Sequence, residues 1–244
     1  MRETDRLLLA FDTSTEALAV ALCGAGLAAH WNGPGGPQAS ARLLPQARAL
    51  LAAAGAGWRD LDAVAFGAGP GAFTGLRTAC AVAQGLAFGL GCPVIAVDSL
   101  MIVAEDAAAQ GADGPLWVAM DARMDEVYAA EYEPADQGPG WTPRQAPALY
   151  TLPALNAVWE RTPPRRLAGS APAAFGARLR AGAAGIVERE IDRAAALGRL
   201  ATRLHAAGAG VDAAQAAPLY LRDKVALTVA ERSAAKERRA LGAP

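Results

Sequence analysis

The sequence has no excess of either charge. Its 244 residues carry 23 Lys and Arg against 24 Asp and Glu, which gives a formal net charge of −1. A protein that grips nucleic acid by itself usually has a strong basic excess. We therefore expect any contact with nucleic acid to be shared with a partner.

Histidine is scarce, and the two that are present do not form a metal motif. His30 and His205 cannot provide HxxxH or HExxH, the spacings that put two imidazoles on one face of a helix. We expect both to be structural, and we expect no metal site. The sequence also lacks GxSxG, and neither histidine has an obvious acidic partner, which argues against a serine hydrolase.

Paired cysteines and long apolar runs are also missing. Cys23, Cys80 and Cys92 form no CxxC pair, a pattern typical of reduced cysteines in the cytosol. No unbroken apolar run approaches the ~20 residues that span a bilayer. The early apolar run is interrupted by Asp12 and is too short for a signal peptide. We expect a cytoplasmic protein without membrane contact.

Apolar residues make up 53% of the chain, enough for a sizeable core in one large domain or two small lobes. In the first half, the apolar patterns predict strands at 7–11, 17–23, 27–31, 63–66 and 93–97, and helices at about 40–54, 75–90 and 99–109.

The second half begins again with strands. Two are expected within 115–133, joined by a turn around 123–125, and a turn-rich connection (136–147), a short strand (165–171) and helices at 173–181 and 192–207 follow. Two halves that each begin with strands indicate an α/β protein with two lobes. We place the N-terminal lobe at 1–99, the C-terminal lobe at 100–222, and a polar, partly disordered tail at 223–244.

A glycine-rich loop leads into the second expected helix, in the stretch FGAGPGAFTGLRTACAVAQ. The loop can hold a phosphate, hold a partner, or only pack against its own chain. It matches neither GxxxxGK[ST] nor GxGxxG, which disfavours phosphate. We expect Gly69, Gly71 and Gly75 to be structural, the last two because they permit unusual backbone angles. Arg77 lies near the helix N-terminus, where a cation is unfavourable, so we expect it to have an anionic or carbonyl partner, inside the protein or on a neighbour.

Small residues recur at every fourth position of this helix and therefore share faces. They form two rows, Ala79–Ala83–Ala87 and Ala81–Gly85–Gly89. A glycine inside a helix costs roughly 1 kcal/mol relative to alanine, so something should offset Gly85. Close approach of another helix would do so. That helix can belong to this chain or to a partner.

The turn after the first strand is a candidate nucleotide contact. Asp12, Thr13 and Ser14 offer a carboxylate and hydroxyls to a phosphate or metal. The alternative is a turn that bonds to its own backbone. The segment DTSTE has no glycine, and Glu16 would repel phosphate, so we favour a vestigial site.

A second polar cluster lies in the apolar middle of the chain and comprises Asp121, Arg123, Asp125 and Glu126. Paired carboxylates can do acid–base work. The turn context favours a solvated hairpin tip or Arg–carboxylate pairs instead. We assign no catalysis to this cluster.

Several segments resemble the TsaB (YeaZ-like) family, and together they cover nearly the whole chain. They are LDAVAFGAGPGAFTGLRTACAVAQGLAFGLGCPVIAVDSL, which is the most specific, and LLAFDTSTEALAVAL, ASARLLPQARALLAAAG, MDARMDEVYAAEY and PLYLRDKVALT. The resemblance implies a degenerate two-lobed α/β fold like that of actin-like ATPases, namely sugar kinases, heat-shock chaperones and actin. Mixed sheets flanked by helices and related βββαβα lobes are expected.

The resemblance also implies a non-catalytic subunit of the bacterial machinery that makes N6-threonylcarbamoyladenosine in tRNA. Such subunits pair with the catalytic subunit TsaD through their first two helices, and the ATPase TsaE joins the pair. We expect tRNA contact through the complex, no cofactor bound by this chain alone, and self-association of the isolated chain through the same helices. The expected interface residues are Leu43, Leu50, Arg77, Cys80, Ala83, Gly85 and Leu86.

Two other function classes stay open. A small-molecule kinase or ATPase of the actin-like fold would turn over nucleotide by itself. A glycoprotease-type peptidase, a label that related proteins have carried, is disfavoured by the missing metal spacing and the missing catalytic triad.

Overall fold

The computed structural model describes residues 6–24, 26–135, 140–187 and 189–222. The tail expected at 223–244 lies outside the described residues. Across the described part of the chain, no helix is both long enough and apolar enough to cross a membrane.

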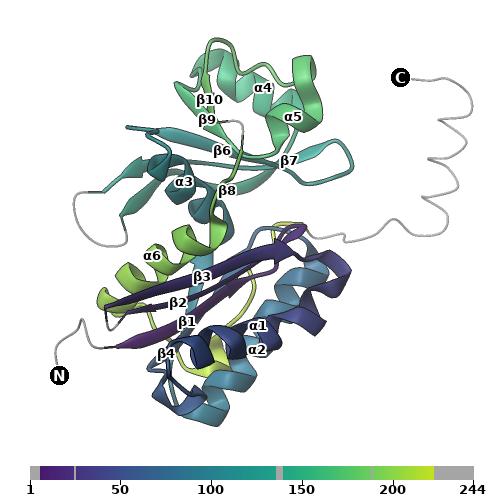
Figure 1. The fold of residues 1–244 in the computed structure, drawn as a ribbon. Coiled ribbons are helices and arrows are strands. Elements are labelled where there is room, and N and C mark those ends of the chain that lie inside the picture. Colours follow the sequence, from purple (N-terminus) through teal and green to yellow (C-terminus); the bar gives the residue numbers. More distant parts are fainter. Residues whose placement is uncertain (1–5, 25, 136–139, 188, 223–244) are drawn as a thin grey trace, which may run out of the picture.

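The first half of the chain builds a five-stranded sheet with helices on it (Figure 1). Its strands are β1 (Leu7–Asp12), β2 (Ala17–Gly24), β3 (Leu27–Pro34), β4 (Ala63–Gly69) and β5 (Val94–Asp98). Its helices are α1 (Ala39–Ala53), α2 (Phe73–Leu90) and α3 (Ser99–Ala109), with 3-10 turns η2 (Gly36–Gln38) and η3 (Trp58–Asp60). The expected elements of this half are confirmed, with ends that differ by up to three residues.

The second half builds another five-stranded sheet. Its strands are β6 (Leu116–Asp121), β7 (Glu126–Pro134), β8 (Trp141–Thr151), β9 (Arg166–Ala168) and β10 (Gly185–Val187). Its helices are α4 (Leu152–Arg161), α5 (Ala171–Phe175) and α6 (Arg193–Ala206), with 3-10 turns η4 (Gly176–Arg178) and η5 (Ala213–Gln215).

Several elements of this half differ from expectation. The helix predicted at 173–181 is confirmed only as the short α5 and the 3-10 turn η4, so it is wrong beyond Arg178, and β10 was not predicted. The turn-rich connection predicted at 136–147 is wrong from Trp141 onward, because β8 begins there. Pro143 and Pro147 suggested a loop, yet β8 lies at the edge of its sheet, where proline is tolerated. Helix α4 follows β8 directly and was not predicted.

The two sheets have the same topology. Their strand orders are β3-β2-β1-β4-β5 and β8-β7-β6-β9-β10. In each sheet the first strand pairs antiparallel with the second and parallel with the fourth. The α/β fold of two related lobes with mixed sheets, implied by the resemblance to actin-like ATPases, is confirmed.

Alternate residues of β1 face different helix layers, as the two-residue period of a strand requires. Leu7, Leu9 and Phe11 pack with α1 and α2, whereas Leu8 and Ala10 pack with α3 and α6. The layers are therefore α1 with α2, the first sheet, α3 with α6, the second sheet, and α4 with α5 (Figure 1).

The last helix crosses back to the first sheet. Helix α6 packs against β1, β2 and β3, and the chain after it returns beside β4, where the Leu219 N–H donates to the Ala68 carbonyl at 2.7 Å. The predicted assignment of 100–222 to the second lobe is therefore wrong for residues 193–219. The physical reason is that α6 covers apolar residues of the first sheet that no earlier helix covers.

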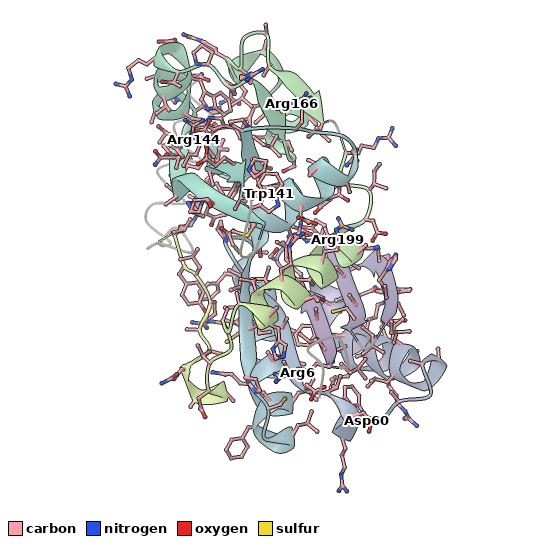
Figure 2. The ribbon with its side chains drawn as sticks, turned by 90° about the vertical axis from the view of Figure 1, so that its left-hand side faces the viewer. Arg6, Asp60, Trp141, Arg144, Arg166 and Arg199 are labelled. Carbon is pink, nitrogen blue, oxygen red and sulfur yellow. The ribbon has the colours of Figure 1, made fainter. Side chains whose placement is uncertain are left out.

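Glu105 on α3 ties the two lobes together. Its buried carboxylate accepts the indole N–H of Trp141 at 2.9 Å and the Nε–H of Arg199 at 2.6 Å, and it also pairs with Arg203. Figure 2 shows Trp141 and Arg199 near the junction of the lobes. Because several donors satisfy this carboxylate, it can be buried there and hold α3, β8 and α6 together.

Candidate functional site

An internal ion pair closes the turn after β1. Asp12 is fully buried, and its Oδ2 accepts hydrogen bonds from Arg193 Nη2 at 2.6 Å and Nε at 2.9 Å. Arg193, at the start of α6 and 3% exposed, also donates to Ser14 Oγ and pairs with Glu190. Burial alone would lower the pKa of the Arg193 guanidinium, but the charges of Asp12 and Glu190 outweigh burial and raise that pKa.

These contacts use the groups that could have met a nucleotide. The Asp12 carboxylate also accepts the Ser14 N–H, and the Thr13 hydroxyl donates to the Gly75 carbonyl at 2.6 Å. All three candidate residues of this turn are buried. A metal ion at Asp12 would have to displace Arg193, and an unpaired buried charge costs several kcal/mol. The turn therefore bonds to its own chain.

The glycine loop packs against this turn. A Cβ on Gly75 would lie 1.8 Å from the Thr13 carbonyl oxygen, and a Cβ on Gly71 would lie 2.5 Å from that of Ser14. Neither glycine has a positive φ, so the prediction that they permit unusual backbone angles is wrong. They are needed because two backbones approach closely. Gly69 does have a positive φ, of 114°.

The charged cluster of the middle segment forms the β6–β7 turn and is ion-paired. The pairs are Arg123–Asp121, Arg123–Glu16, Asp125–Arg178 and Glu126–Arg222. Residues 123–125 all have left-handed backbone, with φ between 57° and 63°. Arg222 supports this turn, because its Nη2 donates to the Ala122 carbonyl at 2.9 Å. Arg–carboxylate pairing, one of the two expected alternatives, is confirmed.

A cleft of about 760 Å³ lies between the lobes, bordered by these two turns and by the loop before α2. Much of its lining is apolar, for example Leu100, Met120 and Tyr128. Each charged residue that lines it is in an ion pair. Within the described residues, no group of three or more His, Cys, Asp or Glu side chains could hold a metal ion.

Both histidines have protein partners. His30 Nε2 lies 2.8 Å from an Asp192 carboxylate oxygen, and His205 Nε2 lies 3.0 Å from Arg6 Nη1. The two rings thus join α6 to β3 and to the start of β1. These contacts are structural, as the sequence predicted.

The inner faces of α1 and α2 belong to the core. Leu43, Cys80 and Ala83 are buried among apolar residues of the first sheet. These three predicted interface residues are wrong as surface contacts, because a partner could reach them only by displacing the helices. Leu50 and Leu86 are half-buried at the margin of the same core.

The outer faces of the two helices are exposed and apolar, and we call this surface the α1–α2 face. Along α2 it presents Arg77, Ala81, Gly85 and Phe88, which follow one another at intervals of three or four residues. Phe88 is 85% exposed, and Leu44 on α1 is 41% exposed. A groove of about 740 Å³ runs between the helices and is lined by Leu44, Pro45, Arg48, Ala49, Ala52, Trp58 and Leu86.

Gly85 and Gly89 have no packing role within the described chain. A Cβ on either would meet nothing within 4 Å, and neither has a positive φ. The cost of glycine in a helix, about 1 kcal/mol relative to alanine, is therefore not offset by a close approach of any described segment of this protein. Of the two rows of small residues, Ala79–Ala83–Ala87 packs on the sheet and the glycine row faces outward.

Arg77 contacts one aromatic ring and one tyrosine hydroxyl at the N-terminal end of the α1–α2 face. Its guanidinium carbon lies 4.0 Å from the centroid of the Phe73 ring, and its Nε donates to the Tyr220 hydroxyl at 3.2 Å. The two rings are 5.2 Å apart. The predicted anionic or carbonyl partner is absent among the described residues, since a ring and a hydroxyl take that place.

Comparison with known proteins identifies the family. A family model described as TsaD, tRNA N6-adenosine threonylcarbamoyltransferase, matches residues 37–138. A crystal structure from Pseudomonas aeruginosa, described as an uncharacterized protein with similarity to peptidase YEAZ, is 38% identical and covers 89% of this chain and 100% of its own, with a TM-score of 0.81. The chain belongs to the TsaB (YeaZ-like) family. The structure of YeaZ from Pseudomonas aeruginosa is 36% identical to this TsaB-family chain. The match covers 88% of this chain and 100% of YeaZ, with a TM-score of 0.77.

Curated relatives carry the same family name. The tRNA threonylcarbamoyladenosine biosynthesis protein TsaB of Haemophilus influenzae is 44% identical over 124 residues, which is 51% of this chain and 52% of that protein. The Escherichia coli protein of the same name is 41% identical over 133 residues, which is 54% of this chain and 57% of that protein. The match thus spans about half the length of these curated relatives. The family model covers both helices of the α1–α2 face.

Sequence reasoning missed several residues of this TsaB-family chain. Leu44 and Phe88 could have been found, because each is a large apolar residue that follows a core residue of its helix and so lies beside the core row, not in it. Arg193 and Tyr220 carry no such signal. Their partners Asp12 and Arg77 lie 181 and 143 residues away in the chain, so only the fold brings them together.

Proposed function

We propose that this chain is a non-catalytic subunit of the complex that forms N6-threonylcarbamoyladenosine in tRNA, and that its α1–α2 face docks the TsaD-type catalytic subunit. The proposal also follows the names of the curated relatives and the description of the matched family model. The observation that carries it is the outward row of Ala81, Gly85 and Phe88, whose helix cost and apolar exposure nothing in the described chain offsets.

A partner helix along this row would resolve both features. Small residues let two helix axes come close, because the axis separation depends on the side chains at the contact. The same helix would cover Phe88 and fill the groove beside Leu86. An isolated chain would cover this apolar surface with a second copy of itself.

The proposal includes that this chain catalyses no reaction itself. Asp12, the residue best placed to serve a metal-bound nucleotide, is neutralised by Arg193 instead. A subunit with this turn would supply shape and a docking surface, while a TsaE-type ATPase and the catalytic subunit supply nucleotide turnover and transfer. Contact with tRNA would then be made through the complex, in keeping with the net charge of −1.

Mixing the purified chain with the TsaD-type subunit of the same organism tests the proposal. Size-exclusion chromatography with light scattering should show a heterodimer at micromolar concentration, and the isolated chain should hydrolyse no ATP. If no complex forms while the isolated chain turns over ATP, the alternative of an actin-like kinase or ATPase is the better account.

A further inference from the structure

We infer that Arg77 anchors the partner through a single carboxylate at the N-terminal end of the α1–α2 face. This inference rests on the proposed docking and adds the chemistry of one contact. It starts from a cation that Phe73 and Tyr220 hold in place and that has no anionic partner among the described residues.

The guanidinium of Arg77 is held ready for a ligand. Stacking on Phe73 and the hydrogen bond from Nε to Tyr220 fix its plane, yet neither Nη group has a hydrogen-bond partner among the described residues. Tyr220 is itself fixed, because the preceding Leu219 N–H is bonded to Ala68. A preorganised fork loses less side-chain entropy when it binds a carboxylate.

An anion beside Arg77 would be favoured by its position in α2. It is the only charged residue of α2 and lies one turn from the N-terminus, where the helix dipole disfavours a cation. Helix α2 has no acidic residue in its first turn and no capping side chain. A carboxylate beside Arg77 would therefore interact favourably with both the guanidinium and the positive end of the helix.

The surroundings favour a protein carboxylate over a nucleic-acid phosphate. Arg77 continues into an apolar row, and the adjoining groove contributes only one further cation, Arg48. A protein that binds DNA through its phosphates can make about 6–10 such contacts. The described residues of this row and groove offer only two cations for them, Arg77 and Arg48. One Arg–carboxylate pair at one end of an apolar row instead fixes the direction and register of a docked helix.

Binding measurements with the TsaD-type subunit test the inference. Arg77→Gln should raise the Kd about 30-fold or more and flatten its dependence on salt, as expected for loss of a close charge pair. Arg77→Lys should lose part of the affinity, because lysine lacks the fork. Tyr220→Phe removes the hydrogen bond but keeps the ring, so a positioning role predicts a smaller loss. Arg161→Gln, at an exposed arginine of α4, is the matched control and should leave the Kd unchanged.

Carbodiimide coupling identifies the carboxylate directly. In the complex of the Arg77→Lys variant, the reagent takes up the water lost when the introduced amine and the partner carboxylate form an amide. Mass spectrometry should find position 77 joined to one Asp or Glu of the partner. Assignment is simple because the chain has only two native lysines, Lys224 and Lys236.

The outcomes separate the two proposals. If the unmodified chain forms no complex with the catalytic subunit, the proposed function is overturned and this inference falls with it. If the complex forms and Arg77→Gln binds equally well, only the carboxylate anchor is overturned. An effect of Arg77→Gln that appears only when tRNA is added would show a phosphate ligand and would also overturn the anchor.

Discussion

Replacing Gly85 by alanine should stabilise the isolated chain and weaken its complex. Position 85 lies within α2, and a Cβ there meets nothing within 4 Å. Alanine is more favourable than glycine in a helix interior by about 1 kcal/mol. For a chain of this size that gain corresponds to a rise in Tm of about 2–4 °C. Urea unfolding of the isolated chain measures the gain in free energy of unfolding, and thermal unfolding measures the rise in Tm.

A larger side chain at position 85 should reduce affinity for the partner without destabilising the isolated chain. Gly85→Leu also fits the isolated chain, but it places a large side chain where the partner helix approaches. Overpacking of this kind costs about 1–3 kcal/mol, or about 5–150-fold in Kd. Titration calorimetry with the TsaD-type subunit measures the loss. Ala157→Leu adds a side chain of the same size to an exposed position of α4 in the other lobe and should leave the Kd unchanged.

Two results would refute this reasoning. Destabilisation of the monomer by Gly85→Ala, measured at concentrations too low for self-association, would mean that the glycine has a role inside the chain that its open surroundings do not reveal. Wild-type affinity of the Gly85→Leu variant would mean that the partner docks on another surface.

Three further changes test the rest of the account. Gly75→Ala forces a methyl against the Thr13 carbonyl and should lower the free energy of unfolding by about 1–3 kcal/mol or more, measured in urea; an unchanged midpoint would contradict the close approach. Arg193→Met should cost about 3–5 kcal/mol by leaving Asp12 buried and unpaired, and adding Asp12→Asn should restore part of it; strictly additive losses would contradict the pairing. Burial would raise the pKa of Asp192, but hydrogen bonds and nearby positive charge lower it below its ordinary 3.8, so this carboxylate stabilises the fold above that pH. Asp192→Asn keeps a helix-capping side chain but removes the charge. It should therefore lower the free energy of unfolding most at pH 7, and this difference from wild type should vanish as the pH falls through the lowered pKa. An equal difference at all pH values would argue against the shift.

The strands and helices of the first half were predictable because their patterns are strong and uninterrupted. β1 to β5 follow apolar runs, and α1 repeats leucine at helical spacing. β8 was missed because its prolines read as a loop, and only its place at the sheet edge makes them acceptable. The packing of α6 on the first sheet depends on contacts between segments far apart in the chain, so no local sequence pattern predicts it.

The two helices of the proposed docking surface were predicted, but part of the predicted interface set faces the core instead. Both rows of α2 consist of small residues, so the pattern does not say which row is buried. Ala83 proved to be core and Gly85 surface. The sequence identified Gly75 as structural, but the reason for it, the Thr13 carbonyl 1.8 Å from a Cβ, depends on a contact between segments far apart in the chain.

Reconstituted modification of tRNA is the most direct test of the central claim, that this chain acts through docking and performs no chemistry itself. The reaction would contain the TsaD-type subunit, the TsaE-type ATPase, the activated threonylcarbamoyl donor and tRNA, with and without this chain. Product formation should depend on the chain and should fall with Gly85→Leu in proportion to lost complex. Full modification in the absence of the chain would contradict the account.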